Sequence, residues 1–260
     1  MRLSKRKVKA KIGDLCSKMP IFFYNSIDST NTRAKELANL GYEGDAVFIA
    51  RHQTAGRGRM GRHFISDKGK GLYLSILLGK DKSSKTGLSV TTYMAVIASR
   101  VLEKHTHIIP KIKWVNDVYA NGKKLCGILT EGKTNENSSS LVYTVCGIGI
   151  NLRRQKFDSE VKNIATTVED VTGEKADINL LASEIIKEFF SNLHLIGSYD
   201  IANEYKERSL LIGKEVKVIK LSATYKATVV NITNNCELVL RFEDGTEEIL
   251  STGEVSVSIF

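Results

Sequence analysis

The stretch Gln53-Thr-Ala-Gly-Arg-Gly-Arg-Met-Gly-Arg62 lies between two apolar runs, DAVFIAR (45–51) and GLYLSILL (71–78). Short apolar runs that are rich in β-branched and aromatic residues are typical of buried strands. Between them, three glycines permit positive φ angles and a close approach of backbone N–H groups to a ligand. Three arginines add planar donor groups that suit phosphate or carboxylate. The stretch therefore predicts a loop that joins two strands of a sheet and closes over an anion.

This loop matches two common nucleotide-binding motifs only in part. Gly56, Gly58 and Gly61 satisfy the pattern GxGxxG, but a dinucleotide-binding fold needs a helix after the glycines, and a strand follows here. A phosphate-binding P-loop needs Lys-Ser/Thr where Arg62-His63 stands, and the chain lacks the HRD and DFG strings of protein kinases. From the loop alone, a solvated basic loop or an Arg-Gly patch for nucleic acid is an equally good interpretation.

Composition indicates an ordinary globular chain. Its 260 residues, 42% of them hydrophobic and 26% charged, allow one large and one small domain. The apolar runs are shorter than the roughly 18 residues that a membrane-spanning helix needs, and no apolar stretch of a secretory signal follows the basic start. The four cysteines show no metal-ligand spacing, and Cys126 and Cys146 fall in apolar runs, so we expect reduced, buried thiols. These features predict a cytoplasmic protein with no membrane partner.

The formal net charge of +9 is concentrated at the N-terminus. Residues 1–18 hold seven lysines or arginines and one aspartate, a net of +6, which leaves +3 for the other 242 residues. We expect residues 1–19 to form a solvated, frayed basic tail that contacts nucleic acid or an acidic surface weakly. The tail is too short for a helix-turn-helix module.

The apolar periodicity predicts an α+β domain over residues 20–212. Strands are expected at 21–27, 45–51, 71–78, 111–115, 125–130 and 141–150, with a polar loop at 132–140 between the last two. Helices are expected at 32–41, 89–104, 178–195 and 199–208. After Gly213, short strands broken by Asn-Asn and Asp-Gly turns predict a small β-barrel of about five strands over residues 213–260.

Four polar clusters interrupt the apolar strands, each at a strand end or in an adjoining turn. They are Ser29-Thr30-Asn31, the loop 53–62, Lys113-Trp-Val-Asn-Asp117 with Lys124, and Gly147-Ile-Gly-Ile-Asn151. Read singly, they would be a helix cap, a basic loop, a turn with a surface lysine, and sites of β-bulges. Together they suit a small polar substrate that is joined to a nucleotide. Lys124 and Arg59 would neutralise charge on a transferring phosphorus, and Asp117 would hold a Mg²⁺ ion.

Five strings in the chain, STN, QTAGRGRMGR, KWVND, KLCGIL and GIGIN, occur in the order and spacing of the biotin protein ligase family. The chain resembles this family over about residues 20–212. The resemblance implies a mixed β-sheet catalytic domain flanked by helices, of the class II synthetase-like type of biotin and lipoate ligases, followed by a small SH3-like β-barrel. It also implies a Mg²⁺-dependent reaction of biotin with ATP that gives biotinyl-5′-AMP and pyrophosphate. A lysine of the biotin carboxyl carrier protein of acetyl-CoA carboxylase would then take the biotin and release AMP, and the enzyme would be a monomer or homodimer.

The same resemblance assigns roles to residues by matching position. The residues that would bind biotin are Ser29, Thr30, Asn31, Gln53, Gly56, Arg57, Gly58, Arg59, Lys124 and Gly127. The residues that would bind ATP or the adenylate are Arg57, Arg59, Arg62, Phe64, Asn116, Asp117, Lys124 and Asn151. Lys124, Arg59 and Asp117 would carry the catalysis, with Asp117 as the Mg²⁺ ligand. Phe64 stands where a tryptophan covers the adenine in the family, and it would stack there.

Two departures from the family pattern accompany the resemblance. Val115 replaces the proline of KWPND, and because valine keeps the backbone extended, little functional change is expected. The N-terminal helix-turn-helix of the repressor members is missing, so no sequence-specific DNA binding is expected. Two rival interpretations are a lipoate or octanoate transferase, which would lack the arginine-rich loop, and a nucleic-acid-binding regulator, which would need a visible binding fold.

Overall fold

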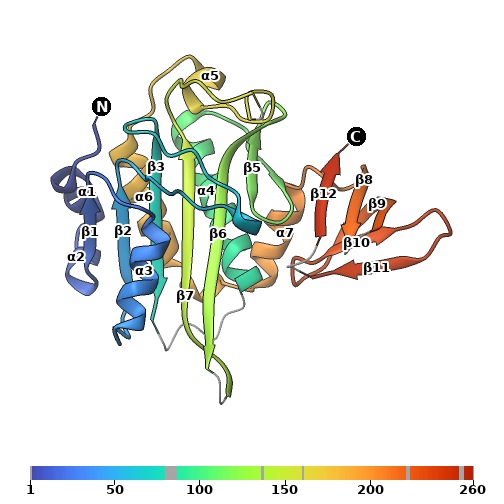
Figure 1. Ribbon diagram of the computed structural model, residues 1–260, viewed down its shortest axis with the longest axis horizontal. Coiled ribbons are helices and arrows are strands. Elements are labelled where there is room, and N and C mark those ends of the chain that lie inside the picture. The colour runs from blue at the N-terminus through green and yellow to red at the C-terminus, as the bar shows by residue number, and fades with distance from the viewer. Residues whose placement is uncertain are drawn as a thin grey trace.

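The computed structural model describes residues 2–79, 87–135, 138–159, 161–220, 223–251 and 255–259. Within these ranges, seven strands form one mixed sheet in the order β1–β2–β3–β7–β6–β5–β4 (Figure 1). The strands are β1 (Ile21–Tyr24), β2 (Ala46–Ala50), β3 (Gly71–Leu78), β4 (Lys111–Lys113), β5 (Asp117–Ala120), β6 (Lys123–Asn135) and β7 (Ser138–Asn151). β1 and β2 run parallel, and the other neighbouring pairs are antiparallel. The arginine-rich loop connects β2 to β3, so the prediction that it joins two strands of a sheet is confirmed.

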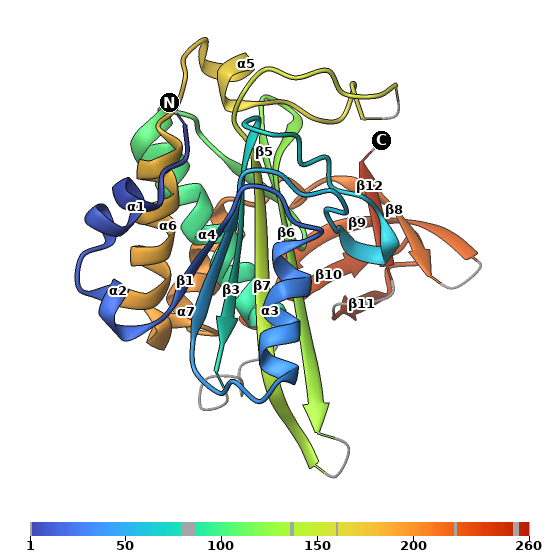
Figure 2. The same cartoon turned by 60° about the vertical axis from the view of Figure 1, so that its left-hand side comes forward.

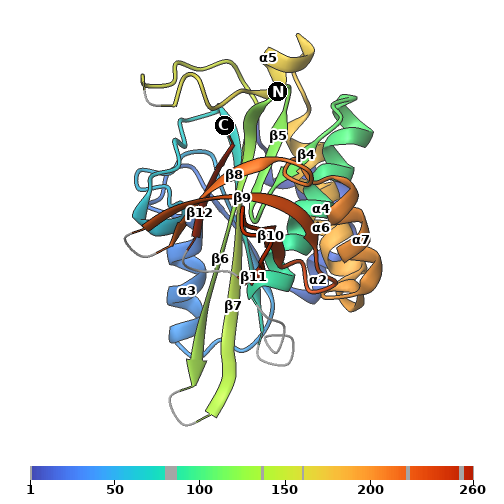
Figure 3. The same cartoon turned by 90° about the vertical axis from the view of Figure 1, so that its right-hand side faces the viewer.

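Helices cover both faces of this sheet (Figure 3). Helix α3 (Thr30–Asn39) lies on one face, whereas α4 (Gly87–Thr106), α6 (Ile178–Ser191) and α7 (Tyr199–Glu207) lie on the other. Because both faces are covered, β2 and β3 are buried along their whole length, which explains why their sequences are apolar without alternation. Among the described helices, none is long and apolar enough to cross a membrane.

The N-terminal segment is ordered, so the prediction of a frayed tail is wrong. Its two helices are α1 (Lys5–Ile12) and α2 (Leu15–Lys18). Helix α1 packs beside α6 (Figure 2), and Leu3, Val8 and Ile12 are buried in the main hydrophobic core. Most of the basic side chains are exposed. The prediction failed because it weighed the charge of the segment and not the helical spacing of its few apolar residues.

β6 and β7 form a longer ribbon than the sequence predicts. The polar loop expected at 132–140 lies largely within these two strands, which pair as far as Asn135 with Ser138, and residues 136–137 are outside the described ranges. The ribbon projects beyond the helices (Figure 1), and residues 132–134 are exposed. Polar composition therefore reflects exposure of the ribbon to solvent and not a loss of strand pairing.

Three further elements end earlier than predicted, and one was not predicted. The strand expected at 21–27 ends at Tyr24. The helix expected at 178–195 ends at Ser191, and a 3₁₀ turn (Leu193–Leu195) follows. The strand expected at 111–115 ends at Lys113, and residues 114–116 form a turn. A short helix, α5 (Val168–Thr172), precedes α6. Such ends depend on tertiary contacts that a local pattern does not contain.

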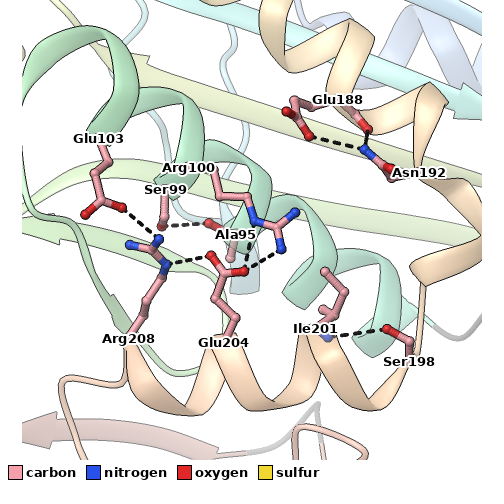
Figure 4. Close-up of polar contacts among 10 residues, drawn as sticks. All are labelled: Ala95, Ser99, Arg100, Glu103, Glu188, Asn192, Ser198, Ile201, Glu204 and Arg208. Carbon is pink, nitrogen blue, oxygen red and sulfur yellow. Dashed lines mark hydrogen bonds and ion pairs between the residues drawn. The ribbon is translucent and has the colours of Figure 1, made fainter.

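Helix α7 is tied to α4 by a network of charged side chains (Figure 4). Glu204 accepts hydrogen bonds from Arg100 Nε over 2.9 Å and from Arg208 Nε over 3.0 Å. Arg208 Nη2 also donates to Glu103 Oε2 over 2.7 Å. Glu204 and Arg208 are largely buried, so this network holds the two helices together better than isolated surface ion pairs would.

The C-terminal region forms a second sheet beside α7 and β5 (Figure 1). Its described strands are β8 (Glu215–Lys220), β9 (Ala223–Ile232), β10 (Leu238–Arg241), β11 (Glu247–Leu250) and β12 (Val255–Ile259). They are antiparallel in the order β11–β10–β9–β8–β12, which confirms the predicted SH3-like fold of this region. Trp114 Nε1 donates to Cys236 O over 2.9 Å in a buried contact, so this region touches the turn after β4.

Candidate active site

A cavity of about 200 Å³ opens on the face of the sheet that carries α3. Its walls come from the start of α3, the arginine-rich loop, the turn after β4, and the middle of β6 and β7. The residues that line it are Ser29, Thr30, Asn31, Gln53, Arg57, Gly58, Arg59, Met60, Arg62, His63, Phe64, Lys113, Trp114, Asn116, Asp117, Lys124, Gly127, Ile128, Leu129, Gly147, Ile148 and Gly149. The four polar clusters of the sequence therefore meet in one cavity, as predicted.

The start of α3 forms an uncharged wall of hydrogen-bonding groups. Gln53 Oε1 accepts hydrogen bonds from Thr30 N over 2.8 Å and from Thr30 Oγ1 over 2.9 Å. Gln53 Nε2 donates to Ser66 Oγ over 3.0 Å. Ser29 is the N-cap residue of α3, but its side chain makes no capping hydrogen bond and lines the cavity. These bonds fix the Gln53 amide, so the wall presents oriented polar groups to a neutral ligand.

Two glycines of β7 make room for side chains on this wall. A Cβ atom at Gly147 would lie 2.1 Å from Asn31 Oδ1, and one at Gly149 would lie 2.5 Å from Phe64 Cε1. Neither distance is compatible with ordinary van der Waals contact. The glycines therefore allow Asn31 and Phe64 to lie directly against the sheet.

The arginine-rich loop is hydrogen-bonded to itself. Gly58 N donates to Arg62 O over 2.7 Å, and Phe64 N donates to Gly56 O over 3.0 Å. At its tip, Met60 has a φ of 55° and is 70% exposed. A Cβ atom at Gly56 would lie 2.3 Å from Phe64 O, so this glycine lets the two arms of the loop approach each other.

The turn after β4 brings Asn116 to the opposite wall. Ile128 N donates to Asn116 O over 2.9 Å, and Asn116 Nδ2 donates to Ile128 O over 2.8 Å, which fixes both the backbone and the amide. Arg59 Nη1 donates to Asn116 Oδ1 over 3.2 Å. This contact connects the tip of the loop to the turn across the cavity.

Val115 lies in this turn and not in the strand predicted at 111–115. The Trp114–Val115 peptide bond is cis. The Tyr205 hydroxyl of α7 donates to Val115 O over 2.9 Å, and both groups are buried. Burial raises the pKa of Tyr205 well above its ordinary value, so the phenol remains a neutral donor. The turn is therefore supported by α7 on one side and, through Trp114, by the C-terminal region on the other.

The end of the cavity next to this turn is cationic. Lys124 Nζ lies 2.7 Å from Asp117 Oδ1. Burial lowers the pKa of Lys113. The charge of Asp117 raises it, and the charges of Lys124 and Arg62 lower it further. Among the described residues that line the cavity, the basic ones are Arg57, Arg59, Arg62, Lys113 and Lys124, and the acidic one is Asp117. Such an excess of positive charge in a partly enclosed site attracts anions such as phosphates.

A metal ion would find one carboxylate in this cavity. The described residues contain no cluster of three or more His, Cys, Asp or Glu side chains that would hold a metal by themselves. Mg²⁺ usually takes one or two carboxylates together with phosphates and water. Asp117 therefore fits a Mg²⁺ ion that arrives with phosphate groups, and the residues do not fit a metal centre built by the protein alone.

Two residues predicted for the site lie outside the cavity lining. They are Gly56, within the loop, and Asn151, which is buried at the end of β7. Several lining residues were given no binding role by the sequence: Met60, His63, Lys113, Trp114, Ile128, Leu129, Gly147, Ile148 and Gly149. Lys113 and Trp114 belong to the KWVND string, so the motif itself was the signal for them. Ile128 and Leu129 belong to the KLCGIL string and Ile148 to GIGIN, so the motifs were the signal for these apolar residues as well.

Two family models match the chain. The model of the biotin/lipoate A/B protein ligase family matches residues 23–151, and that of the biotin protein ligase C terminal domain matches residues 211–258. The bifunctional ligase/repressor BirA of Bacillus subtilis (strain 168) is 31% identical over 234 residues, which are 89% of this chain and 72% of that protein. The chain belongs to the biotin protein ligase family.

Other biotin protein ligases support this assignment. The biotin–[acetyl-CoA-carboxylase] ligase of Mycobacterium tuberculosis is 32% identical over 199 residues, or 73% of this chain and 71% of that protein. The biotin protein ligase from Aquifex aeolicus, solved in complex with biotin and ATP, superposes with a TM-score of 0.79 at 27% identity. That match covers 93% of this chain and 99% of the Aquifex chain. The match thus includes both sheets of the fold.

Proposed function

We propose that this chain uses ATP to join biotin to a lysine of the biotin carboxyl carrier protein of acetyl-CoA carboxylase. The observation that carries the proposal is the polarity of the cavity: an uncharged hydrogen-bonding wall at Thr30 and Gln53 adjoins a cationic end at Arg59 and Lys124. Biotin has a neutral ureido ring at one end and a carboxylate at the other, so it matches this arrangement. The Aquifex relative with biotin and ATP bound supports the same pairing of ligands.

In the first step, an oxygen of the biotin carboxylate attacks the α-phosphorus of ATP. A new bond forms between that oxygen and phosphorus, the bond to the pyrophosphate oxygen breaks, and biotinyl-5′-AMP and pyrophosphate result. Lys124 and Arg59 would stabilise the charge that grows on the α-phosphate, since both reach the cationic end of the cavity. Mg²⁺, held by Asp117 and the phosphates, would neutralise charge on the nucleotide.

In the second step, the neutral ε-amine of the carrier lysine attacks the carbonyl carbon of the mixed anhydride. The C–N bond forms, the bond to the AMP oxygen breaks, and the nitrogen loses a proton. Until the carrier arrives, the arginine-rich loop would shield the anhydride from water.

We propose three further features of the protein. Residues 20–212 would form the catalytic domain and residues 213–260 the C-terminal domain, as the ranges of the two family matches suggest. No operator binding is expected, because α1 packs its apolar face against α6. A cytoplasmic location is supported by three buried free cysteines, Cys126, Cys146 and Cys236.

Transfer to the carrier tests the proposal. Incubation with biotin, ATP, Mg²⁺ and the apo carrier domain is expected to add the mass of one biotinyl group to the carrier, measured by intact-mass spectrometry. A carrier whose acceptor lysine is replaced by arginine is the matched control and should stay unmodified. No mass gain on the intact carrier would contradict the assignment of the carrier.

Replacing Gly147 by alanine is expected to raise the KM for biotin at least about tenfold, because the new Cβ would displace Asn31 from the wall. The matched control is Gly87→Ala, where a Cβ would meet nothing closer than 3.9 Å. Steady-state kinetics at saturating ATP measures both. A wild-type KM for Gly147→Ala would show that the position of Asn31 does not matter for biotin.

The arginine-rich loop is expected to become protected when biotin and ATP are added. It has three glycines and no apolar anchor between Gln53 and Arg62 apart from the exposed Met60, so it should open in the free enzyme. Limited trypsin digestion, followed by mass mapping of cuts after Arg57, Arg59 and Arg62, measures the change. Equal cleavage with and without ligands would remove the idea of a ligand-gated loop.

A further inference from the structure

Glu131 on β6 lies just behind the cavity wall, and its side chain is 19% exposed. Its Oε1 lies 2.6 Å from Lys35 Nζ on α3 and 3.3 Å from Arg57 Nη2 on the loop. Its Oε2 accepts a hydrogen bond from Asn31 Nδ2 over 2.9 Å. One carboxylate therefore connects β6, α3 and the arginine-rich loop, and two of its three partners line the cavity.

The first of these partners is the amide of Asn31, whose orientation Glu131 helps to set. Asn31 Nδ2 also donates to Leu129 O over 3.1 Å, and Asn31 Oδ1 accepts from Ser75 Oγ over 2.6 Å. Turning the amide around would place its oxygen against a carboxylate and a carbonyl, which is repulsive. Asn31 therefore donates both N–H groups to the protein and keeps one oxygen lone pair for a ligand.

The second partner is Arg57, through which Glu131 holds the loop. Arg57 is 49% exposed, and an exposed ion pair alone is weak. Here the carboxylate is already fixed by Lys35 and Asn31, so pairing with Arg57 costs little further side-chain entropy. The backbones of Arg57 and His63 also form a β-bridge, so the ion pair that restrains Arg57 restrains both arms of the loop.

Glu131 is charged at neutral pH. Burial by itself would raise its pKa, but the hydrogen bonds from Lys35 and Asn31 and the charges of Lys35 and Arg57 outweigh burial, so the pKa lies below its ordinary value. The carboxylate thus offers two charged acceptor oxygens to three donors.

We propose that Glu131 is a positioning residue of the biotin site, which orients the Asn31 amide and holds the arginine-rich loop closed through Arg57. This proposal rests on the proposed function, because it assigns both groups to the binding of biotin. Glu131 itself does not line the cavity, so it acts through its partners and not by touching the substrate.

Glu131→Gln separates charge from size. Glutamine has one acceptor oxygen and turns an NH₂ group toward donors, so Asn31 and the two cations cannot all be satisfied. The KM for biotin is expected to rise about tenfold with a smaller change in kcat, as one charge-assisted contact is lost. Tryptic cleavage after Arg57 in the presence of biotin and ATP is expected to become about tenfold faster for the same reason.

The matched control is Glu36→Gln on α3. Glu36 is also paired with an arginine, at 2.6 Å from Arg33 Nη1, but it is 49% exposed and does not line the cavity. A double-mutant cycle with Arg57→Met gives a readout that a merely structural role would not change. In the Arg57→Met background, Glu131→Gln should alter loop cleavage at Arg59 and Arg62 much less than it does in the wild type.

A wild-type KM and wild-type loop cleavage in Glu131→Gln would overturn the proposal, as would full additivity with Arg57→Met. If Glu131→Gln does not fold, as judged by its Tm, Glu131→Asp takes its place, because it keeps the charge but is one methylene shorter. That variant should show a smaller rise in the KM for biotin and a smaller increase in loop cleavage. Wild-type values for both would again overturn the proposal. Lack of biotin-dependent activity in the wild type would contradict the proposed function instead, since loop cleavage needs no catalysis.

Discussion

Replacing Lys124 by alanine is expected to lower the rate of adenylate formation by about 10²–10³-fold, while the Kd for biotin changes much less. Lys124 Nζ lies 2.7 Å from Asp117 and within contact distance of Gly127, where a Cβ atom would lie 3.3 Å from it. The ammonium group is therefore held in place at the cationic end of the cavity. A charge that meets the α-phosphate mainly in the transition state contributes to kcat and little to ground-state binding.

The neighbouring Lys123 provides the matched control for this experiment. Lys123→Ala removes a lysine that is exposed and does not line the cavity, so its adenylation rate should equal that of the wild type. The backbone of Lys124 is fixed by hydrogen bonds with Ile164 and Thr166, so the alanine variant should keep its fold. Single-turnover formation of biotinyl-5′-AMP and equilibrium binding of biotin are the two measurements. Normal adenylation in Lys124→Ala would show that Lys124 is a surface lysine without a catalytic role.

The variant Arg59→Gly is expected to label unrelated proteins with biotin. Arg59 Nη1 donates to Asn116 Oδ1 over 3.2 Å, so it connects the loop to the opposite wall, and it lines the cationic end of the cavity, where the adenylate phosphate is proposed to lie. Losing one charge-assisted contact worth about 1.5–3 kcal/mol should weaken retention of the adenylate roughly ten- to a hundredfold. Adenylate should still form, because Lys124 remains, but it would leave the enzyme and react with exposed lysines.

Biotin incorporation into an unrelated lysine-rich protein, without carrier, measures this leak. Met60→Gly is the control for loop flexibility, because a glycine suits the φ of 55° at that position and leaves the guanidinium in place. Arg59→Lys keeps a positive charge and should leak less than Arg59→Gly. Equal labelling by Arg59→Gly and the wild type, with adenylate made by both, would show that Arg59 does not retain the intermediate.

The sequence predicted the strands and clusters of the site because each has a local signature. The glycine and arginine pattern of residues 53–62 predicted a loop between two strands, and the four polar clusters do meet in one cavity. A buried polar residue in an apolar strand, Ser75 in β3, was a signal that the prediction overlooked, although its hydroxyl bonds Asn31. The functional roles of these residues stay predictions.

Other features could not be predicted because they depend on contacts between distant segments. Glu131 reaches Asn31 across 100 positions of sequence, and Trp114 reaches Cys236 across 122. The N-terminal helix was missed for a related reason: its few apolar residues form a recognisable pattern only once they pack against α6. Local patterns give the elements of this fold, whereas the support behind the cavity wall comes from tertiary packing.

The most direct test of the central claim is exchange of labelled pyrophosphate into ATP by the wild-type protein. Exchange is expected to require biotin and Mg²⁺, to be absent with lipoate or octanoate in place of biotin, and to be strongly reduced in Lys124→Ala. No exchange with biotin, or equal exchange with lipoate or octanoate, would contradict the assignment of this cavity to biotin activation.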